Sequence, residues 1–308
     1  MQVSGRGTLG LVLATCTAVL WATLPIALKG ALEVLDFWTL TWFRFLTALL
    51  FTYGWLAWRR RLPDLRVRPR AAHLLLGIAS VGLIGNYVLY LLGLAFTTPA
   101  NAQLLIQLAP LLLAFGAVVC FGERLSRSQV LGFIAIALGL AGFAFDQRAR
   151  LVDSRLSYGL GIALIAIAAV SWAIFGLAQK ALLGRGFGSQ QILLVIYAAA
   201  SLLLWPLASP GRLLALDGAH WAAVAYCCFN TIAAYGAFAE ALAHWEAARV
   251  SAVLALTPLL TMGTVAVAHR LIPDTIAAEQ LGWLSVTAAL VVVAGSVVAS
   301  LARRAAPS

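Results

Sequence analysis

Charged side chains are scarce in this sequence. Asp, Glu, Lys and Arg make up 10% of the 308 residues, whereas hydrophobic residues make up 63%. A soluble globular protein carries about 25% charged residues, which keep its surface in contact with water. This chain cannot cover itself with such a polar surface, so a large soluble enzyme with an oversized core is excluded. Most of its surface must therefore face an apolar environment.

Cysteine is also rare, and the motifs of common enzymes are missing. Two of the four cysteines are adjacent and the other two are isolated, a spacing that fits neither a disulfide framework nor a metal site. No HExxH or GxSxG motif is present, and no pair of carboxylates falls inside an apolar segment. We therefore expect no metal, no cofactor and no enzymatic activity.

Long apolar runs dominate the sequence instead. An α-helix needs about 20 apolar residues to span a bilayer. Such segments lie at residues 8–28, 37–58, 72–95, 99–121, 128–146, 157–180, 189–208, 219–242, 247–269 and 279–301. The alternation typical of a β-barrel is absent. The first segment is too long for the apolar core of a signal peptide, so we expect it to be retained as a helix.

Basic residues are unevenly distributed over the loops between these spans, and cytoplasmic loops are the ones enriched in Lys and Arg. Fourteen fall on one side: Arg6, Arg59, Arg60, Arg61, Arg66, Arg68, Arg70, Arg124, Arg127, Lys180, Arg185, Arg249, Arg303 and Arg304. Six fall on the other: Lys29, Arg148, Arg150, Arg155, Arg212 and Arg270. We predict that both termini are cytoplasmic. The basic loop RRRLPDLRVRPR (59–70) then faces the membrane surface rather than a nucleic acid.

One apolar segment occurs twice. Residues 18–29 read AVLWATLPIALK and residues 169–180 read AVSWAIFGLAQK, each with a Lys eight positions after its Trp. Three further pairs share a separation of 148 residues: Tyr87 with Tyr235, Ala100 with Ala248, and Pro110 with Pro258. The two copies are five spans apart, an odd number, so they cross the bilayer in opposite directions.

This repeat predicts the fold class and the mode of action. We expect an all-α membrane protein of ten transmembrane helices, built as two inverted five-helix repeats at residues 1–150 and 151–308. Inverted halves can exchange two slightly different shapes and so open a central site to either side in turn, as secondary transporters do. The sequence therefore favours a carrier, although an aqueous channel is compatible with the same repeat.

Three stretches resemble a known family. FGERLSRSQVLGFIAIALGLAG (121–142) resembles the hallmark of EamA-type members of the drug/metabolite transporter superfamily, in which a Gly-Glu-Arg sequence links the fourth span to a Gly-rich fifth span. WFRFLTALL (42–50) is similar to that family's second-span Arg motif, and TTPANAQLLIQLAPLLLAF (97–115) to its fourth span. The second linker, HRLIPDTIAAEQLG (269–282), departs from the pattern because it has no Glu at the corresponding place.

The resemblance covers nearly the whole chain and implies an exporter of small metabolites in the bacterial cytoplasmic (inner) membrane. Its Trp and Tyr residues make the chain most similar to the aromatic amino-acid exporters of that family. We therefore expect export of small neutral, aromatic or apolar, amino acids or related metabolites. The expected partners are the substrate and the bilayer, and the expected assembly is a monomer or a weak dimer.

Polar and aromatic side chains inside the spans are the candidates for substrate binding, because such groups must face protein or water. They are Trp21, Tyr87, Tyr90, Gln103, Gln107, Trp172, Tyr226, Asn230 and Tyr235. The amides can bond a zwitterion without being charged, and the mid-span indoles Trp21 and Trp172 can form a flat apolar floor. Hydrogen bonding between helices and plain core packing are the alternative roles.

Four further residues are expected to shape or gate the pathway. Arg44 is the only basic residue well inside a span; it can pair with a carboxylate, cap carbonyls, point outward along the helix or bind a substrate carboxylate. Pro110 and Pro258 remove backbone donors and bend their helices. Glu123 is placed to cap the N-terminus of the fifth helix.

No carboxylate falls at a predicted midplane, where ion-coupled carriers commonly hold one. We therefore expect facilitated, uncoupled transport. The alternatives are a proton-coupled drug/metabolite antiporter and a transporter of phosphorylated or nucleotide-linked sugars. The latter would need several cations in its site to hold phosphate, whereas only Arg44 is available.

Overall fold

The computed structural model describes residues 7–65, 69–122, 125–146, 157–244, 247–271 and 282–301, and every regular element in these ranges is a helix. The first half contains α1 (Gly7–Ala31), α2 (Phe37–Trp58), α3 (Arg70–Phe96), α4 (Pro99–Leu105), α5 (Leu108–Phe121) and α6 (Arg127–Asp146). The second contains α8 (Ser157–Leu183), α9 (Ser189–Leu204), η1 (Trp205–Leu207), η2 (Pro210–Ala215), α10 (Gly218–His244), α11 (Ala247–Leu254), α12 (Thr257–Leu271) and α13 (Trp283–Leu301). The predicted junction at residues 150 and 151 lies outside the described residues.

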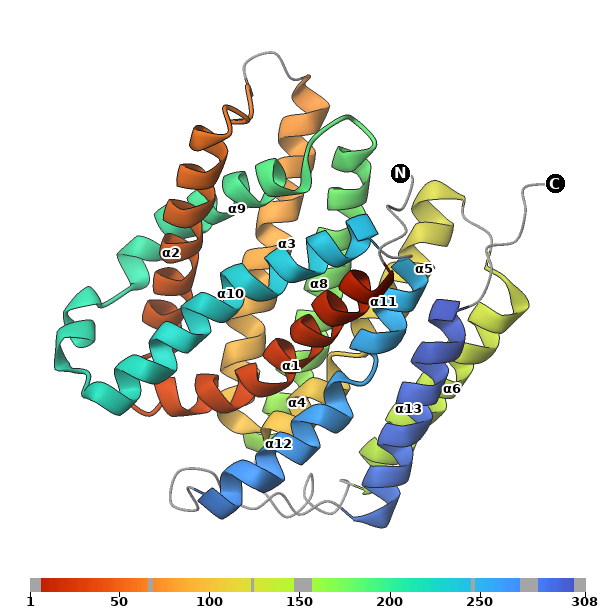
Figure 1. The fold of residues 1–308 in the computed structure, drawn as a ribbon. Coiled ribbons are helices and arrows are strands. Elements are labelled where there is room, and N and C mark those ends of the chain that lie inside the picture. The colour runs from red at the N-terminus through yellow and green to blue at the C-terminus, as the bar shows by residue number, and fades with distance from the viewer. Residues whose placement is uncertain are drawn as a thin grey trace.

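These helices account for the predicted spans (Figure 1). In the described part of the chain, eight helical segments are long and apolar enough to cross a membrane, with α4 and α5 forming one of them and α11 and α12 another. The two remaining spans are α2, which has 22 residues and is rich in aromatic side chains, and α13, a shorter apolar helix. The prediction of an all-α membrane protein is confirmed.

The fourth and ninth spans are each interrupted near the expected proline, where the chain forms two helices, α4 with α5 and α11 with α12, instead of one bent helix. Pro110 cannot donate to the carbonyl of Ile106, which instead accepts a hydrogen bond from the amide of Ala109 at 2.9 Å. Pro258 likewise cannot donate to the carbonyl of Leu254, which accepts a hydrogen bond from the hydroxyl of Thr257 at 2.6 Å. The two prolines therefore interrupt equivalent helices at equivalent depths.

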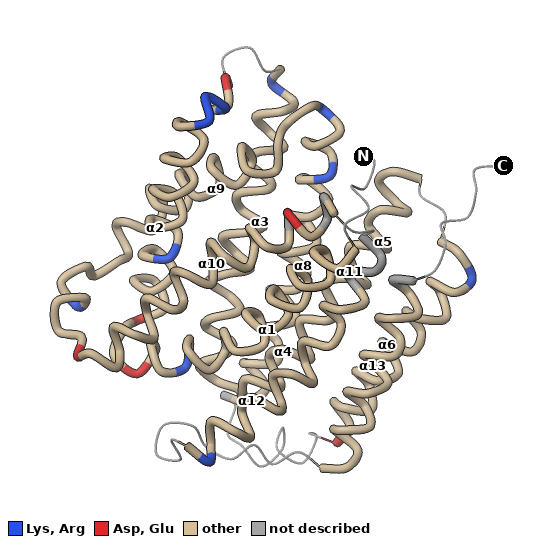
Figure 2. The backbone as a smooth tube through the Cα atoms, in the orientation of Figure 1, with Lys and Arg blue, Asp and Glu red and all other residues tan. Residues whose placement is uncertain are grey.

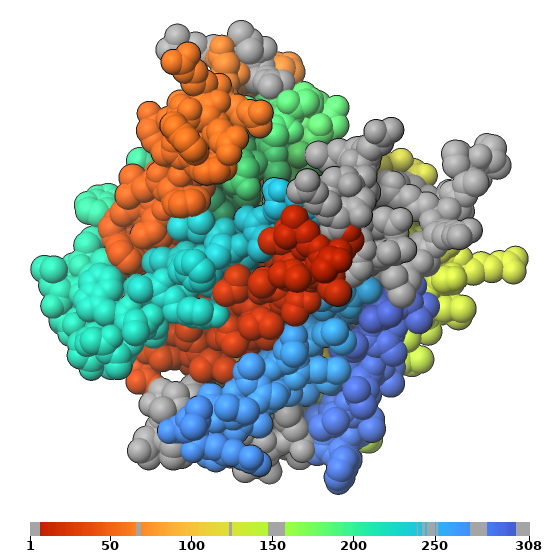
Figure 3. Space-filling model, in the orientation of Figure 1, coloured from red at the N-terminus to blue at the C-terminus, as the bar shows by residue number. Residues whose placement is uncertain are grey.

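The helices pack as a pseudo-two-fold arrangement. Helix α3 packs along α8 and α1 packs along α10, which are equivalent contacts in an inverted repeat. Helices α2 and α9, and also α6 and α13, pack against their own counterparts. In the space-filling view α1 lies between α10 and α12 (Figure 3), as α8 contacts α3 and α5 on the other side of the axis. Helix α1 descends in Figure 1 whereas α8 rises, so the halves are inverted.

Glycines allow two of these helix pairs to approach closely. A Cβ added at Gly132 of α6 would lie 2.5 Å from the carbonyl oxygen of Gly295 in α13, and one added at Gly295 would lie 2.6 Å from the carbonyl oxygen of Gly132. In α3, a Cβ at Gly82 would lie 2.9 Å from the carbonyl oxygen of Ser171 in α8. Backbone-to-backbone contact of this kind is how helices associate where burial of apolar surface gives no advantage over lipid.

The equivalent crossing in the other half is made differently. Asn230 of α10 stands 148 residues after Gly82, and Leu20 of α1 stands 151 residues before Ser171. There the side-chain amide of Asn230 donates to the carbonyl of Leu20 at 2.6 Å. One crossing is therefore a close backbone contact and its counterpart is a side-chain hydrogen bond, so the two halves are alike in fold but not in shape.

Charged residues of the described ranges gather at two opposite ends of the helices (Figure 2). The exception is Arg44, which lies within α2, eight residues from the N-cap residue Asp36. This distribution matches a protein whose central belt lies in hydrocarbon and whose ends lie in water.

Candidate functional site

Two symmetry-related tyrosines meet at the centre of the molecule. Tyr87 comes from α3 and Tyr235 from α10, and both side chains pack into the same central cluster, where Tyr87 acts on the phenol of Tyr235. Equivalent residues of two halves can touch only on the axis that relates the halves. The predicted binding residues Tyr87 and Tyr235 therefore mark the repeat interface, where carriers hold their substrates.

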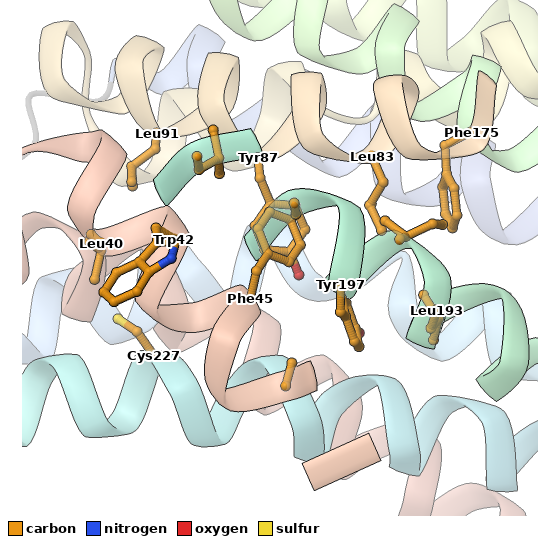
Figure 4. Packing of buried hydrophobic residues seen from close by; sticks show 14 of the residues in the cluster. Leu40, Trp42, Phe45, Leu83, Tyr87, Leu91, Phe175, Leu193, Tyr197 and Cys227 are labelled. Atoms are coloured by element: carbon orange, nitrogen blue, oxygen red, sulfur yellow. The ribbon is translucent and has the colours of Figure 1, made fainter. Parts of the chain in front are cut away.

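Aromatic rings surround this tyrosine pair. The ring of Phe45 in α2 lies 4.6 Å from that of Tyr87 and 5.8 Å from that of Tyr197 in α9 (Figure 4). Phe45 and Tyr197 are equally distant from the N-caps of α2 and α9, Asp36 and Gly188, so they too form a pair across the axis. The centre is thus a stack of rings contributed by both halves.

Arg44 points into this centre. It is 4% exposed, its Nε donates to the hydroxyl of Thr231 at 3.1 Å, and its guanidinium carbon lies 4.8 Å from the centre of the Tyr87 ring. The option that Arg44 points outward along its helix is therefore wrong. Asp36 does not pair with it; that carboxylate caps α2 through Thr39 and lies 3.6 Å from Arg212.

Trp21 lies against the same cluster from α1. Its ring is 5.8 Å from Tyr235, edge to face, and 5.8 Å from Phe238. Its counterpart Trp172 is partly buried against the same core, and its ring contact is with Phe175 of its own helix at 6.4 Å. The two predicted indoles therefore occupy related but different environments, which is a second departure from exact symmetry.

The predicted polar residues fall into two groups. The hydroxyl of Tyr90 in α3 donates to the amide oxygen of Gln103 in α4 at 3.2 Å, which joins two candidates directly. Gln107 lies in the turn that precedes α5, so the helical face expected to join Gln103, Gln107 and Pro110 is interrupted.

Tyr226 and Asn230 were expected to act together as an aromatic and an amide. Each instead bonds to α1, Tyr226 through the hydroxyl of Thr23 and Asn230 through the carbonyl of Leu20. The Oδ1 atom of Asn230 is buried without a hydrogen-bond partner. Within the described ranges these two residues thus tie α10 to α1.

The residues expected to gate the pathway are placed as follows. Pro110 and Pro258 sit in the first turns of α5 and α12, directly after the breaks. Glu123 lies outside the described residues. Ser126 caps the N-terminus of α6. Its backbone amide donates to Oε1 of Gln129 at 2.9 Å, and the backbone amide of Gln129 donates to the Ser126 hydroxyl at 3.2 Å.

The halves are also linked by polar groups at the end where α1 joins α2. The carboxylate of Glu33 lies 3.6 Å from the ring of His220, in the first turn of α10. The carboxylate of Asp36 lies 3.6 Å from the guanidinium of Arg212, in η2. The backbone amide of His220, together with its ring, holds the pKa of Asp217 below its ordinary value. In the described part of the chain no three His, Cys, Asp or Glu side chains come together as a metal site would require.

Three residues of the centre were not identified from the sequence: Phe45, Tyr197 and Thr231. A signal for the first two was available, because aligning the second and seventh spans by their starts pairs them. Thr231 gives no such signal, since a threonine inside a span commonly bonds its own helix, as it does here to the carbonyl of Cys227 at 2.9 Å.

Fold and centre together define a membrane transporter built from a duplicated helical unit. The chain belongs to the EamA-like transporter family, whose model matches residues 8–145 and again residues 159–301. The expected family is thereby confirmed, and the match occurs once in each half.

The relatives agree with this assignment. The chain is 37% identical over 300 residues to the "Uncharacterized inner membrane transporter YhbE" of Escherichia coli K12, a match covering 96% of this chain and 92% of that protein. It is 35% identical over 304 residues to an "Uncharacterized transporter" of Haemophilus influenzae, covering 97% of each. A solved crystal structure with 21% identity covers 96% of this chain and 98% of its own, with a TM-score of 0.61, and supports the fold.

Proposed function

We propose that this transporter exports small neutral amino acids or related metabolites, chiefly aromatic or apolar ones, across the bacterial inner membrane. The location follows that of the YhbE relative, whose name places it in the inner membrane. The observation that carries the substrate class is the ring cluster at the axis, formed by Tyr87, Tyr235, Phe45 and Trp21. Rings prefer to pack edge to face or offset against other rings, which favours a substrate with an aromatic or flat apolar side chain.

Alternating access is the proposed mechanism. The two halves share a fold, yet one crossing is the backbone contact at Gly82 and its counterpart is the hydrogen bond from Asn230 to Leu20. The indoles Trp21 and Trp172 also differ in their ring contacts. A carrier needs its two halves in different shapes at any moment, so that exchanging the shapes moves the opening to the other side.

The proposed transport is uncoupled. The sequence places no Asp or Glu midway along a span, and the carboxylate of Glu240, near the end of α10, is 62% exposed. The centre therefore offers no carboxylate that could carry a proton across. In proteoliposomes loaded with labelled amino acids, efflux should follow the substrate gradient alone. Accumulation driven by an imposed proton gradient would instead support the antiporter alternative.

The substrate class is tested with a panel of labelled amino acids and a pair of Trp variants. Trp21→Ala should reduce transport of phenylalanine several-fold more than transport of alanine, because only the former loses a ring contact of about 0.5–1.5 kcal/mol. Trp283→Ala is the matched control, since Trp283 is 88% exposed at the start of α13. Equal losses for both substrates in Trp21→Ala would show that the indole serves packing only. A panel in which sugar phosphates are transported and amino acids are not would refute the proposal.

A further inference from the structure

Arg44 has an incomplete set of partners. Its Nε donates to Thr231, and the face of the guanidinium lies over the Tyr87 ring. Its two terminal amino groups make no hydrogen bond to any described residue, and no ion pair within the described ranges includes Arg44. A side chain with five N–H donors is therefore held through one of them.

A buried guanidinium with so few partners is stabilised by a bound anion. Taking a guanidinium out of water is costly, and a neutral hydroxyl and the face of one ring replace only part of its hydration. Inside a membrane protein, a buried ionisable residue without a fixed partner marks a functional site by default. Other described basic residues lie toward the ends of the helices, so nothing else of positive charge competes for that anion (Figure 2).

From this geometry we infer that Arg44 binds the carboxylate of the transported molecule, an assignment that rests on the proposed function and adds a chemical requirement to it. The planar fork of a guanidinium matches the two oxygens of a carboxylate, and the free terminal amino groups are the ones that form such a paired contact. A zwitterion or a monocarboxylate is therefore the class of molecule that this site takes.

Thr231 orients the guanidinium for this contact. Its hydroxyl donates to the carbonyl of Cys227 at 2.9 Å, so its lone pairs are directed at Arg44 and accept from Nε. That bond holds the Nε side of the planar guanidinium and leaves its two terminal amino groups available. Tyr87 and Tyr197 belong to the same buried cluster, and the guanidinium of Arg44 lies over the Tyr87 ring.

A single cation limits the charge of the group that can be bound. One Arg balances one carboxylate, whereas a phosphate at neutral pH carries up to two charges and is usually held by several cations or backbone amides. The contacts of Arg44 thus favour a carboxylate over a phosphate. In this assignment Arg44 binds the carboxylate of the substrate and the aromatic rings contact its side chain.

The test uses the full-length protein in detergent and pairs of molecules that differ only in the acid group: benzoate with benzamide, and phenylalanine with phenylalaninamide. Binding is followed by the rise in melting temperature with ligand concentration. Wild-type protein should bind the acids at least tenfold more tightly than the amides. In Arg44→Gln the acid affinity should fall about 10- to 100-fold, the range for losing hydrogen bonds to a charged group, while the amide affinity stays the same. Arg270→Gln removes an equal charge from an exposed site at the end of α12 and should bind both classes like wild type.

Each other outcome refutes the assignment. If Arg44→Gln binds benzoate as well as wild type does, or if wild type does not distinguish acid from amide, Arg44 is a packing residue. If Arg44→Gln does not fold, Arg44→Lys keeps the charge without the fork and should weaken acid binding at least threefold relative to amide binding; an unchanged ratio overturns the inference. Amino-acid transport in proteoliposomes is measured separately. If the protein binds benzoate more tightly than benzamide but transports no amino acid, the proposed function is refuted and the assignment of Arg44 as a carboxylate site is supported.

Discussion

The contact between α6 and α13 offers a sharp test of the packing. In Gly132→Ala the new methyl carbon would lie 2.5 Å from the carbonyl oxygen of Gly295 and 2.6 Å from the amide nitrogen of Ala299. These distances are about 1 Å shorter than the ~3.5 Å of a favourable contact between non-bonded atoms. Both neighbours are backbone atoms that cannot rotate away, so the two helices must move apart along their contact.

The expected cost follows from that separation. Overpacking of a close contact costs about 1–3 kcal/mol, against a gain of about 1 kcal/mol when Ala replaces Gly in a helix. We expect Gly132→Ala to lower the melting temperature in detergent, measured by loss of the monodisperse peak in size-exclusion chromatography after heating. Gly54→Ala in α2 is the matched control: no atom lies within 4 Å of its added Cβ, so only the gain in helix propensity remains.

A double variant decides whether the loss comes from this contact. The methyl of Gly295→Ala would meet the carbonyl oxygen of Gly132 at 2.6 Å, so either substitution opens the same gap. Once α6 and α13 have separated for one methyl, the second fits at a smaller cost, and Gly132→Ala/Gly295→Ala should destabilise by less than the sum of the single variants. Strict additivity, or a Gly132→Ala variant as stable as Gly54→Ala, would refute the close contact.

Three further outcomes are expected. Thr261→Val removes a hydroxyl that lies 3.0 Å from the carbonyl of Ala22 in α1 and 3.0 Å from the carbonyl of Thr257 in its own helix, and should destabilise by about 1 kcal/mol in the same melting assay; no change would mean that the bond to α1 is not formed. Gly122→Ala places a methyl on a left-handed residue (φ 64°) at the end of α5 and should cost about 1 kcal/mol, measured against Gly54→Ala. Asp217 has a lowered pKa in the folded protein, so the stability from its ionised form is present above the unfolded pKa and is lost as the pH falls through the folded one. Asp217→Asn, which keeps the helix cap, should therefore melt below wild type at neutral pH and approach it below about pH 4; a pH-independent difference would exclude this linkage.

The sequence predicts the spans and their duplication well, for physical reasons. Length and apolarity are imposed by the thickness of the bilayer, so ten segments stand out from the loops. The separation of 148 residues identified Tyr87 and Tyr235 as counterparts, and the structure brings them together on the axis. Where the repeat preserves residue types, the sequence thus carries information on tertiary structure.

The direction in which side chains point was much harder to predict. Lipid and protein interior are both apolar, so a span shows no contrast between an inward and an outward face. This left four options open for Arg44, and only the packing of α2 against α9 and α10 shows that it points inward. The pairing of Asn230 with α1 rather than with Tyr226 escaped prediction for the same reason. The sequence predicts a bend at Pro110 and at Pro258 but not a complete break, because a proline inside a span either bends a helix or ends it, and its neighbours decide which.

The interruptions at Ile106–Gln107 and Ala255–Leu256 have a mechanical consequence. In an unbroken helix, tilting one end against the other stretches backbone hydrogen bonds. Here the carbonyls of Ile106 and Leu254 are already satisfied locally, by the amide of Ala109 and the hydroxyl of Thr257. Each joint is therefore crossed by fewer backbone hydrogen bonds than an unbroken helix, so tilting one half-helix against the other strains fewer of them. Under the proposed alternating access, two such joints, one in each repeat, are the places where the helices would bend as the two ends of the bundle open in turn.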